Sequence, residues 1–308
     1  MEKKFEVTVS PHIFSKRSVR TVMLEVCIAL IPAFVFSIRL WGLSILKTYI
    51  TAIFFAHLSE WVFLKIRKKN FEFDGSALVT AVLFVMTLPP TVSLFAVAVG
   101  VSFGIIFGKQ FFGGLGHNVF NPALLGRAFL VASFPTEMTT WISHIDATTT
   151  ATPLGAWKFA GEATWEIKKI FLGTCPGSIG ETSALLLIIG GIYLIIRKIV
   201  DWRIPVFYIL TVFILSSVFY FFDATKGNPF FHLFAGGLML GAFFMATDPV
   251  TAPANLKARI LFATGCGILT LVIRYFGGYP EGVMYSILIM NAFAPLLEKI
   301  EDFSPFGL

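Results

Sequence analysis

The chain has 308 residues, of which 56% are hydrophobic and 14% are charged, and its mean hydropathy is +0.81. Soluble domains carry about 25% charged residues, so this composition argues against a soluble domain and favours a protein that lies in lipid. The net charge of +6 does not indicate nucleic-acid binding, because the basic residues flank apolar runs instead of lining one helix face. The three cysteines are far apart in sequence, which argues against a zinc or iron–sulfur site built by this chain alone.

Apolar runs divide the chain into ten predicted membrane segments. They cover residues 20–38, 44–64, 76–88, 91–107, 119–134, 182–196, 204–221, 230–246, 258–275 and 282–298. We expect helices, because a lone strand leaves backbone groups unpaired in hydrocarbon and because these runs do not alternate as barrel strands do. The first apolar run is long and lacks a small-residue cleavage site, so we interpret it as a retained span and not as a signal peptide.

The distribution of lysine and arginine predicts the orientation. With the N-terminus in the cytoplasm and every segment crossing, 16 of these residues lie on the cytoplasmic side and 7 on the outer side. The positive-inside rule favours this arrangement, in which both termini are cytoplasmic. Residues 136–181 then form an outer loop between a first transmembrane half, 1–135, and a second transmembrane half, 182–308.

A weak internal repeat relates the two halves. Residues 75–91 and 236–253 are both Gly-led apolar runs that end in Thr, any residue, Pro, so that Thr87 corresponds to Thr247. In the ten-segment arrangement these runs cross in opposite directions, as in an inverted-topology repeat. The first run is only about 20 Å long at 1.5 Å per residue, which favours a broken or re-entrant helix that lines a binding site. Chance similarity between Gly- and Pro-containing apolar segments is the alternative.

Several polar residues lie within or at the ends of the predicted spans. They are Glu25, His57, Glu60, Arg127, His232 and Asp248. A charge at mid-bilayer costs about 3 kcal/mol or more, so such groups tend to face protein or cavities and to carry function. Structural pairing and a functional role are equal alternatives for Glu25 and Arg127. Asp248 is a candidate ion contact, although its place near a predicted end also allows it to reach water.

The stretch GKQFFGGLGHNVFNPALLGRAFL (108–130) has the densest polar pattern. Its glycines allow tight turns, and Asn118 and Asn121 would be neighbours on one face if this part were helical. Each amide can donate and accept hydrogen bonds together, which suits the edge of a flavin or another heterocycle. The alternative is a helix start that Asn121 caps, with Pro122 at the first helical position. Both interpretations can hold at once.

Four motifs in chain order carry a family resemblance. SPH (10–12), the stretch at 108–130, DATTTATPL (146–154) and GSIGETSALLLIIGG (177–191) together resemble the NqrB/RnfD family, whose members are membrane subunits of the sodium-translocating NADH:quinone reductase and of the Rnf electron-transport complex. The resemblance covers nearly the whole chain. The length of the chain is closer to that of the Rnf subunit than to that of the reductase subunit. It implies an all-α integral membrane fold of about ten transmembrane helices in two inverted five-helix halves, like those of urea and ammonium channels.

The resemblance also implies a covalent cofactor. Members of this family carry FMN joined through its phosphate to the last threonine of a motif that is approximately D-x-x-S/T-G-A-T. The matching residues here are Asp146, Thr149, Thr150, Ala151 and Thr152. Attachment at Thr152 is therefore implied, although Thr150 replaces the common glycine. The sequence around Thr152 supports this attachment in part. Thr152 precedes Pro153, and a residue before proline is held extended, which presents its side chain.

The function follows from the same resemblance. We expect a membrane electron-transfer subunit of an ion-translocating ferredoxin:NAD oxidoreductase complex in the prokaryotic cytoplasmic membrane, without an independent catalytic site. Its expected partners are the lipid bilayer and the other subunits, among them a second flavinylated subunit and iron–sulfur subunits. Riboflavin is a further expected cofactor, bound without a covalent bond at Asn118 and Asn121. The alternative class is a stand-alone channel or secondary transporter of the urea/ammonium-channel type, which the broken-helix repeat alone would suggest.

Overall fold

The computed structural model describes residues 18–143, 148–161, 165–180 and 183–300. Within these ranges the protein is helical and forms no strand, and an isolated β-bridge joins Ile142 to Thr149. The predicted all-α fold is therefore confirmed. The SPH motif and Asp146 lie outside the described residues.

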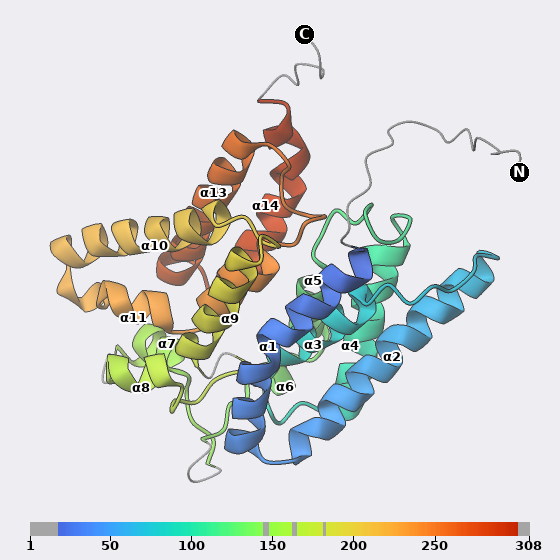
Figure 1. Ribbon diagram of the computed structural model, residues 1–308. Coiled ribbons are helices and arrows are strands. Elements are labelled where there is room, and N and C mark those ends of the chain that lie inside the picture. Colours follow the sequence, from blue (N-terminus) through green and yellow to red (C-terminus); the bar gives the residue numbers. More distant parts are fainter. Residues whose placement is uncertain (1–17, 144–147, 162–164, 181–182, 301–308) are drawn as a thin grey trace, which may run out of the picture.

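Each of the ten predicted segments contains helix (Figure 1). The first half contains α1 (Val19–Trp41), α2 (Ser44–Ile66), α3 (Ser76–Met86), α4 (Leu94–Ile105) with its π-helical extension η1 (Ile106–Gln110), and α5 (Pro122–Ser133). The connecting segment contains α6 (Pro135–Thr139), α7 (Pro153–Gly155), η2 (Ala156–Ala160) and α8 (Ile167–Leu172). The second half contains α9 (Ala184–Ile196), α10 (Arg203–Phe222), η3 (Ala224–Lys226), α11 (Pro229–Phe234), α12 (Leu238–Leu240), η4 (Gly241–Met245), α13 (Leu256–Phe276) and α14 (Val283–Glu298).

Four helices, α1, α2, α10 and α13, are long and apolar enough to cross a membrane. The segment from η3 through η4 would make a fifth span, which is bent by 47° between Phe234 and Leu238. The other apolar helices have 10 to 17 residues, and α3 has only 11, as the short run at 76–88 predicts. Length and composition thus support four or five membrane-spanning helices among the described residues. The ten membrane crossings expected from the sequence remain a prediction.

The two halves repeat the same pattern of helix contacts. In the first half α2 packs against α3 and α4, and α4 packs against α5; in the second half α10 packs against η4, which directly follows α12, and against α13, and α13 packs against α14. The halves meet where α1 packs against α9 and α5 packs against α14, which are the first and last helices of each half. This correspondence supports the repeat predicted from the two Thr-x-Pro motifs.

Glycine allows close approach at these contacts. A Cβ atom at Gly190 of α9 would lie 2.3 Å from the carbonyl oxygen of Ala29 in α1, and one at Gly126 of α5 would lie 2.6 Å from the carbonyl oxygen of Gly100 in α4. Helices in lipid associate mainly through such close backbone packing, because lipid tails are as apolar as the side chains. A larger residue at either glycine would separate the helix pair.

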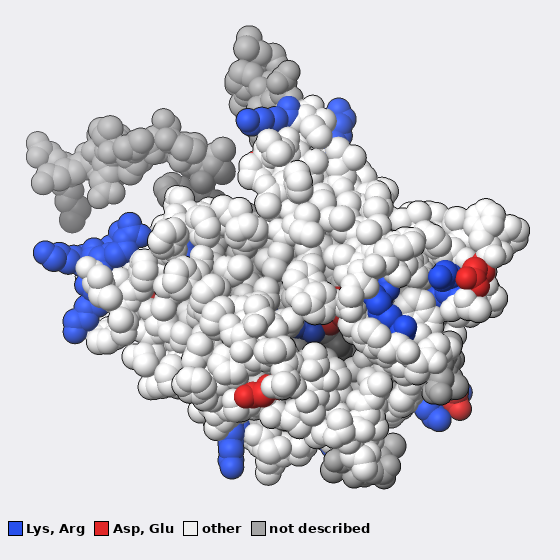
Figure 2. All heavy atoms as spheres, turned by 180° about the vertical axis from the view of Figure 1, so that it is seen from behind, with Lys and Arg blue, Asp and Glu red and all other residues white. Residues whose placement is uncertain are grey.

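The exterior of the helices is apolar. On α1 the side chains of Ile28, Ile31 and Val35 are half exposed, at the spacing that places them on one helix face. Figure 2 shows a broad surface with few charged side chains, on which Lys and Arg lie mostly near the edges. Such a surface matches hydrocarbon and not water. Together with the long apolar helices it identifies a multi-pass membrane protein.

Candidate functional site

Charged residues inside the spans are paired across the two halves. The guanidinium of Arg197 donates to the Glu25 carboxylate at 2.5 and 2.8 Å, which joins α9 to α1. The guanidinium of Arg127 in α5 donates to Glu281, just before α14, at 2.7 Å. Both pairs lie at the contacts between corresponding helices. Structural pairing is therefore the role that the structure shows for Glu25 and Arg127.

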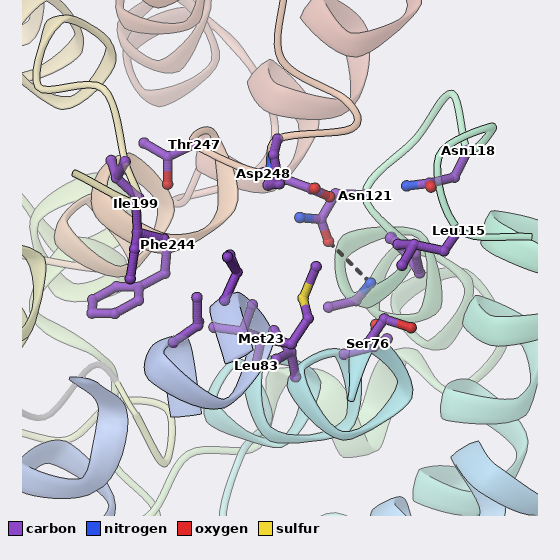
Figure 3. Close-up of a pocket in the computed structure, with 18 of the residues that line it drawn as sticks. Met23, Ser76, Leu83, Leu115, Asn118, Asn121, Ile199, Phe244, Thr247 and Asp248 are labelled. Carbon is purple, nitrogen blue, oxygen red and sulfur yellow. Dashed lines mark hydrogen bonds between the residues drawn. The ribbon is translucent and has the colours of Figure 1, made fainter. Parts of the chain in front are cut away.

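A cleft that we call the asparagine cleft lies between α1, the start of α3, the start of α5 and the turn after η4. Its polar lining includes Lys109. Figure 3 labels five further polar residues of the lining: Ser76, Asn118, Asn121, Thr247 and Asp248. Its cavity has a volume of about 70 Å³ and is partly open to solvent. Small-molecule sites combine an apolar wall with a few polar groups, and the lining of this cleft has that character.

Asn118 and Asn121 both line this cleft, but they precede α5 and do not share a helix face. Asn121 caps α5: its Oδ1 accepts from the N–H groups of Ala123 and Leu124 at 3.0 and 3.3 Å, and its Nδ2 donates to the Met245 carbonyl. The predicted cap is therefore confirmed. Asn118 is buried, and its Oδ1 accepts no hydrogen bond from the described residues. An unpartnered buried acceptor of this kind calls for a ligand or water, so Asn118 is the better candidate for binding.

Lys109 was missed as a site residue, because the predicted orientation counted it only among the basic residues of the cytoplasmic side. The structure buries it at the edge of the asparagine cleft with 2% of its surface exposed. Its Nζ donates to Glu60 Oε1 at 2.5 Å and to the Ser76 hydroxyl. In the sequence, Glu60 and Lys109 lie near the C-terminal ends of two apolar runs. This pattern is too common to predict that the two residues form an ion pair.

Asp248 lies in the turn after η4, where it lines the asparagine cleft. Its Oδ1 accepts from the N–H of Val250 at 3.1 Å, so the carboxylate stabilises its own turn. Burial raises the pKa of Asp248 to about 6, and the hydrogen bond from Val250 opposes that shift. The carboxylate therefore has both a local structural role and a charge that changes near neutral pH.

A second cleft, which we call the threonine cleft, lies beside the connecting segment. Its cavity of about 50 Å³ lies between Thr152, the 175–177 turn, the 234–236 bend and Glu281. Thr152 has the extended backbone predicted for a residue before proline, with φ −64° and ψ 157°. Its Oγ1 accepts from the N–H of Gly155 at 3.1 Å, at the start of α7. The acceptor oxygen implied by the resemblance thus sits at a cleft wall and at a helix start.

The remaining residues of the motif do not line the threonine cleft. Thr149 and Ala151 are exposed, Thr149 in the bridge with Ile142, and the N–H of Thr150 donates to the carbonyl of Trp141. Asp146 is not among the described residues. Within the described part of the motif, Thr152 is therefore the residue that the structure places at a cavity.

The helix that Thr152 starts is fixed to the second half. Lys158 Nζ donates to the carbonyls of Ile273, Arg274 and Tyr279 at 2.8 to 3.1 Å, at the end of α13. Partial burial lowers the pKa of Lys158. Trp157 is buried with its indole edge-on to His232, and its Nε1 donates to the Thr225 carbonyl. These contacts hold Thr152 in place, although it lies in a connecting segment.

The two clefts occupy corresponding places in the two halves. The asparagine cleft lies at the start of α3 and the threonine cleft at the bend before α12, which is the matching helix of the repeat. Asn121 lies directly before α5, and Glu281 lies just before α14. Glu281 Oε1 accepts from the N–H of Gly237 at 2.7 Å, at the start of α12. The repeat therefore generates two candidate binding sites.

Comparison with known proteins identifies the family. The sequence profile of the NQR2, RnfD, RnfE family matches residues 6–307. The D subunit of a proton-translocating ferredoxin:NAD(+) oxidoreductase complex of Clostridium ljungdahlii is 47% identical over 98% of this chain and 96% of its own length. The D subunit of the Na(+)-translocating complex of Acetobacterium woodii is 43% identical over 100% of this chain and 96% of its own length. The D subunit of an ion-translocating oxidoreductase complex of Stutzerimonas stutzeri is 36% identical over 92% of this chain and 91% of its own length. The chain belongs to the NQR2, RnfD, RnfE family.

Proposed function

We propose that this chain is the RnfD component of an Rnf-type ferredoxin:NAD oxidoreductase complex and that it carries FMN esterified to Thr152. The names of relatives that match almost the whole chain support the complex. One of these relatives is named for protons and another for Na⁺, so family membership leaves the coupling ion open. The proposed location is the prokaryotic cytoplasmic membrane, with both termini in the cytoplasm and ten crossings in two inverted halves.

The position of Thr152 Oγ1 is the observation that carries the cofactor proposal. This oxygen lies at the threonine cleft and faces the N–H of Gly155. Helix starts favour negative charge, so a phosphate ester at this oxygen would meet N–H groups and not carbonyls. A Cβ at residue 155 would lie only 3.1 Å from Oγ1, so the glycine also leaves room there. These residues fit a phosphoester.

The chain's own residues would position the cofactor and limit its contact with water. Trp157 and Lys158 fix the helix that follows Thr152, and Glu281 supplies a carboxylate in the cleft wall. Bound FMN would supply the redox chemistry. Electrons would come from and go to other subunits, among them a second flavinylated subunit and iron–sulfur subunits.

A second flavin, riboflavin, is proposed for the asparagine cleft. The unpartnered Oδ1 of Asn118 supports this assignment, because a flavin edge carries both a donor and acceptors. Asn121 would contribute mainly by holding the start of α5, since both ends of its amide already have partners. The cleft also has apolar lining residues, Phe244 among them, of the kind that contact a heterocycle.

Covalent flavin fluorescence after denaturing electrophoresis tests the proposal against a stand-alone channel or transporter. We expect a fluorescent band for the wild-type chain and none for Thr152→Val, which lacks the hydroxyl. Loss of the helix cap costs about 1 kcal/mol, so the variant should still reach the membrane. Thr149→Val is the matched control, because Thr149 is exposed and does not line the cleft. A wild-type chain without a band would favour the channel class.

A further inference from the structure

A continuous hydrogen-bonded chain connects solvent to the asparagine cleft. At its outer end lies Asp74, whose side chain is 27% exposed. The Ser76 hydroxyl donates to Asp74 Oδ1 at 2.6 Å, and Lys109 Nζ donates to the Ser76 hydroxyl. Ser76 and Lys109 both line the cleft. A proton can therefore pass from water to the cleft through two side-chain links, each of which is a direct contact.

The buried ammonium has a chemical use beyond folding. A buried ion pair is a weak source of stability, since well-packed apolar residues of similar volume serve as well or better. Glu60 nevertheless accepts from both Lys109 and Gln110, at 2.5 and 2.7 Å, in the interior of the helical bundle. The lysine also lies in the π-helical turn η1, and such turns are common at functional sites. The arrangement keeps a proton donor at a cavity wall.

We propose that Asp74, Ser76 and Lys109 form a proton relay to the molecule bound in the asparagine cleft. The proposal rests on the assignment of a flavin to that cleft. When the complex has reduced a bound flavin, Lys109 would give up the proton of one N–H bond, and that proton would form an N–H bond on the reduced ring. The Ser76 hydroxyl then returns a proton to Lys109 and takes one from Asp74, which takes one from solvent. No electron passes through the relay.

The other ionisable groups around this relay have separate tasks. Glu60 of α2 accepts from Lys109 Nζ at 2.5 Å and holds this side chain in place. Asp248 lines the same cleft from the turn after η4, where Val250 holds its carboxylate. His57 lies one turn before Glu60, but its Nδ1 donates to the Ile53 carbonyl and its ring stacks on Phe73. Asp74 Oδ2 lies 3.6 Å from Lys109 Nζ, and the hydrogen-bonded connection between the two residues runs through Ser76.

Proton uptake in the purified complex tests the relay. The spectral signal of the cleft flavin is identified first. It is the part of the absorbance change on dithionite reduction that the wild type shows and Asn118→Leu lacks. Ser76→Ala takes out the middle link but leaves the Lys109–Glu60 pair, and Asp74→Asn takes out the ionisable outer end. Ser59→Ala is the matched control, because Ser59 is a buried serine bonded to Ser102 and does not line the cleft. Spectra and a pH indicator dye record how fast the reduced flavin takes up a proton.

We expect protonation of the cleft flavin to slow by about a hundredfold in Ser76→Ala and Asp74→Asn, and to stay unchanged in Ser59→Ala. Flavin content should be the same in all four proteins. Wild-type protonation rates in Ser76→Ala, with its flavin retained, would overturn the relay; if that variant fails to assemble, a wild-type rate in Asp74→Asn would do the same. A wild-type complex without a noncovalent flavin would overturn the cofactor assignment itself, which flavin extraction reveals separately.

Discussion

The Arg127 guanidinium lies 2.7 Å from the Glu281 carboxylate, although the two residues are 154 positions apart in sequence. The same carboxylate accepts from the N–H of Gly237 and lines the threonine cleft. One side chain therefore connects α5, the start of α12 and the candidate cofactor site. Loss of this carboxylate should affect both the packing of the two halves and the cleft.

Glu281→Leu should lower the stability of the chain by about 3–5 kcal/mol, because it removes one partner of a mostly buried ion pair. Glu166→Leu is the control, since Glu166 pairs with Lys169 on the surface and such pairs are worth about 0–1 kcal/mol. Thermal unfolding of the purified protein in detergent measures both changes. Equal small losses would show that the Arg127–Glu281 pair does not join the halves energetically.

The space beside Thr152 Oγ1 should control flavin attachment. Gly155→Ala places a methyl group 3.1 Å from that oxygen, so the ester should form less completely. Gly177→Ala is the matched control, because Gly177 lines the same cleft but a Cβ there meets no atom within 4 Å. In-gel fluorescence normalised to protein should fall for the first variant alone. Full flavin content in Gly155→Ala would mean that the modifying enzyme works on an opened loop.

The two asparagines of the 108–130 stretch should respond differently to substitution. Asn118→Leu should lower extractable riboflavin with little change in stability, because its Oδ1 has no partner among the described residues. Asn121→Leu should also destabilise the protein by about 1–2 kcal/mol, since it removes the cap of α5. Riboflavin extraction and thermal unfolding separate the two effects. If Asn118→Leu retains riboflavin, the asparagine cleft is not its site.

Local features of the sequence predicted local features of the structure. Asn121 and Pro122 predicted a capped helix start, and Pro153 predicted the extended backbone of Thr152, because each effect acts within a few residues. The short α3 also followed from its length in sequence. The repeat of Thr-x-Pro motifs predicted two related halves, and their equivalent helix contacts support it.

Pairings between distant segments could not be predicted in this way. The predicted orientation placed Lys109 on the cytoplasmic side, whereas the fold brings Glu60 and Ser76 to its ammonium. The carbonyls of Met86 and Leu88, at the end of α3, accept from the N–H groups of Gly180 and Ile179 in the connecting segment. Such contacts depend on tertiary packing, which short-range patterns do not encode.

The proposed orientation can be checked by labelling engineered cysteines in intact cells. Lys168→Cys lies in α8 of the connecting segment, and Lys69→Cys lies between α2 and α3, and both positions are exposed. We expect a membrane-impermeant maleimide to label position 168 in intact cells and position 69 only after permeabilisation. The native cysteines give the background signal in the parent chain. Labelling in the opposite order would reverse the assignment of both faces.

Asp248 tests whether this chain contacts the transported ion. Thr87 and Thr247 occupy corresponding places in the repeat, and each hydroxyl donates to a carbonyl of its own helix, so neither requires an ion. Asp248 adds a carboxylate to the second motif alone, and it lines the asparagine cleft. Asp248→Asn should therefore lower ion uptake per electron in reconstituted vesicles more than Thr87→Val does.

The prediction for Asp248 also sets how the ratio of transported ions to electrons should change with pH. Burial raises the pKa of Asp248 to about 6, so its carboxylate is charged above that pH and neutral below it. A contribution of this charge to ion binding is present above pH 6 and is lost as the pH falls through 6. The ratio of ions to electrons should therefore decline in the wild type between pH 7 and pH 5 and stay low and flat in Asp248→Asn. An unchanged ratio in that variant at pH 7 would leave Asp248 with only its structural hydrogen bond to Val250.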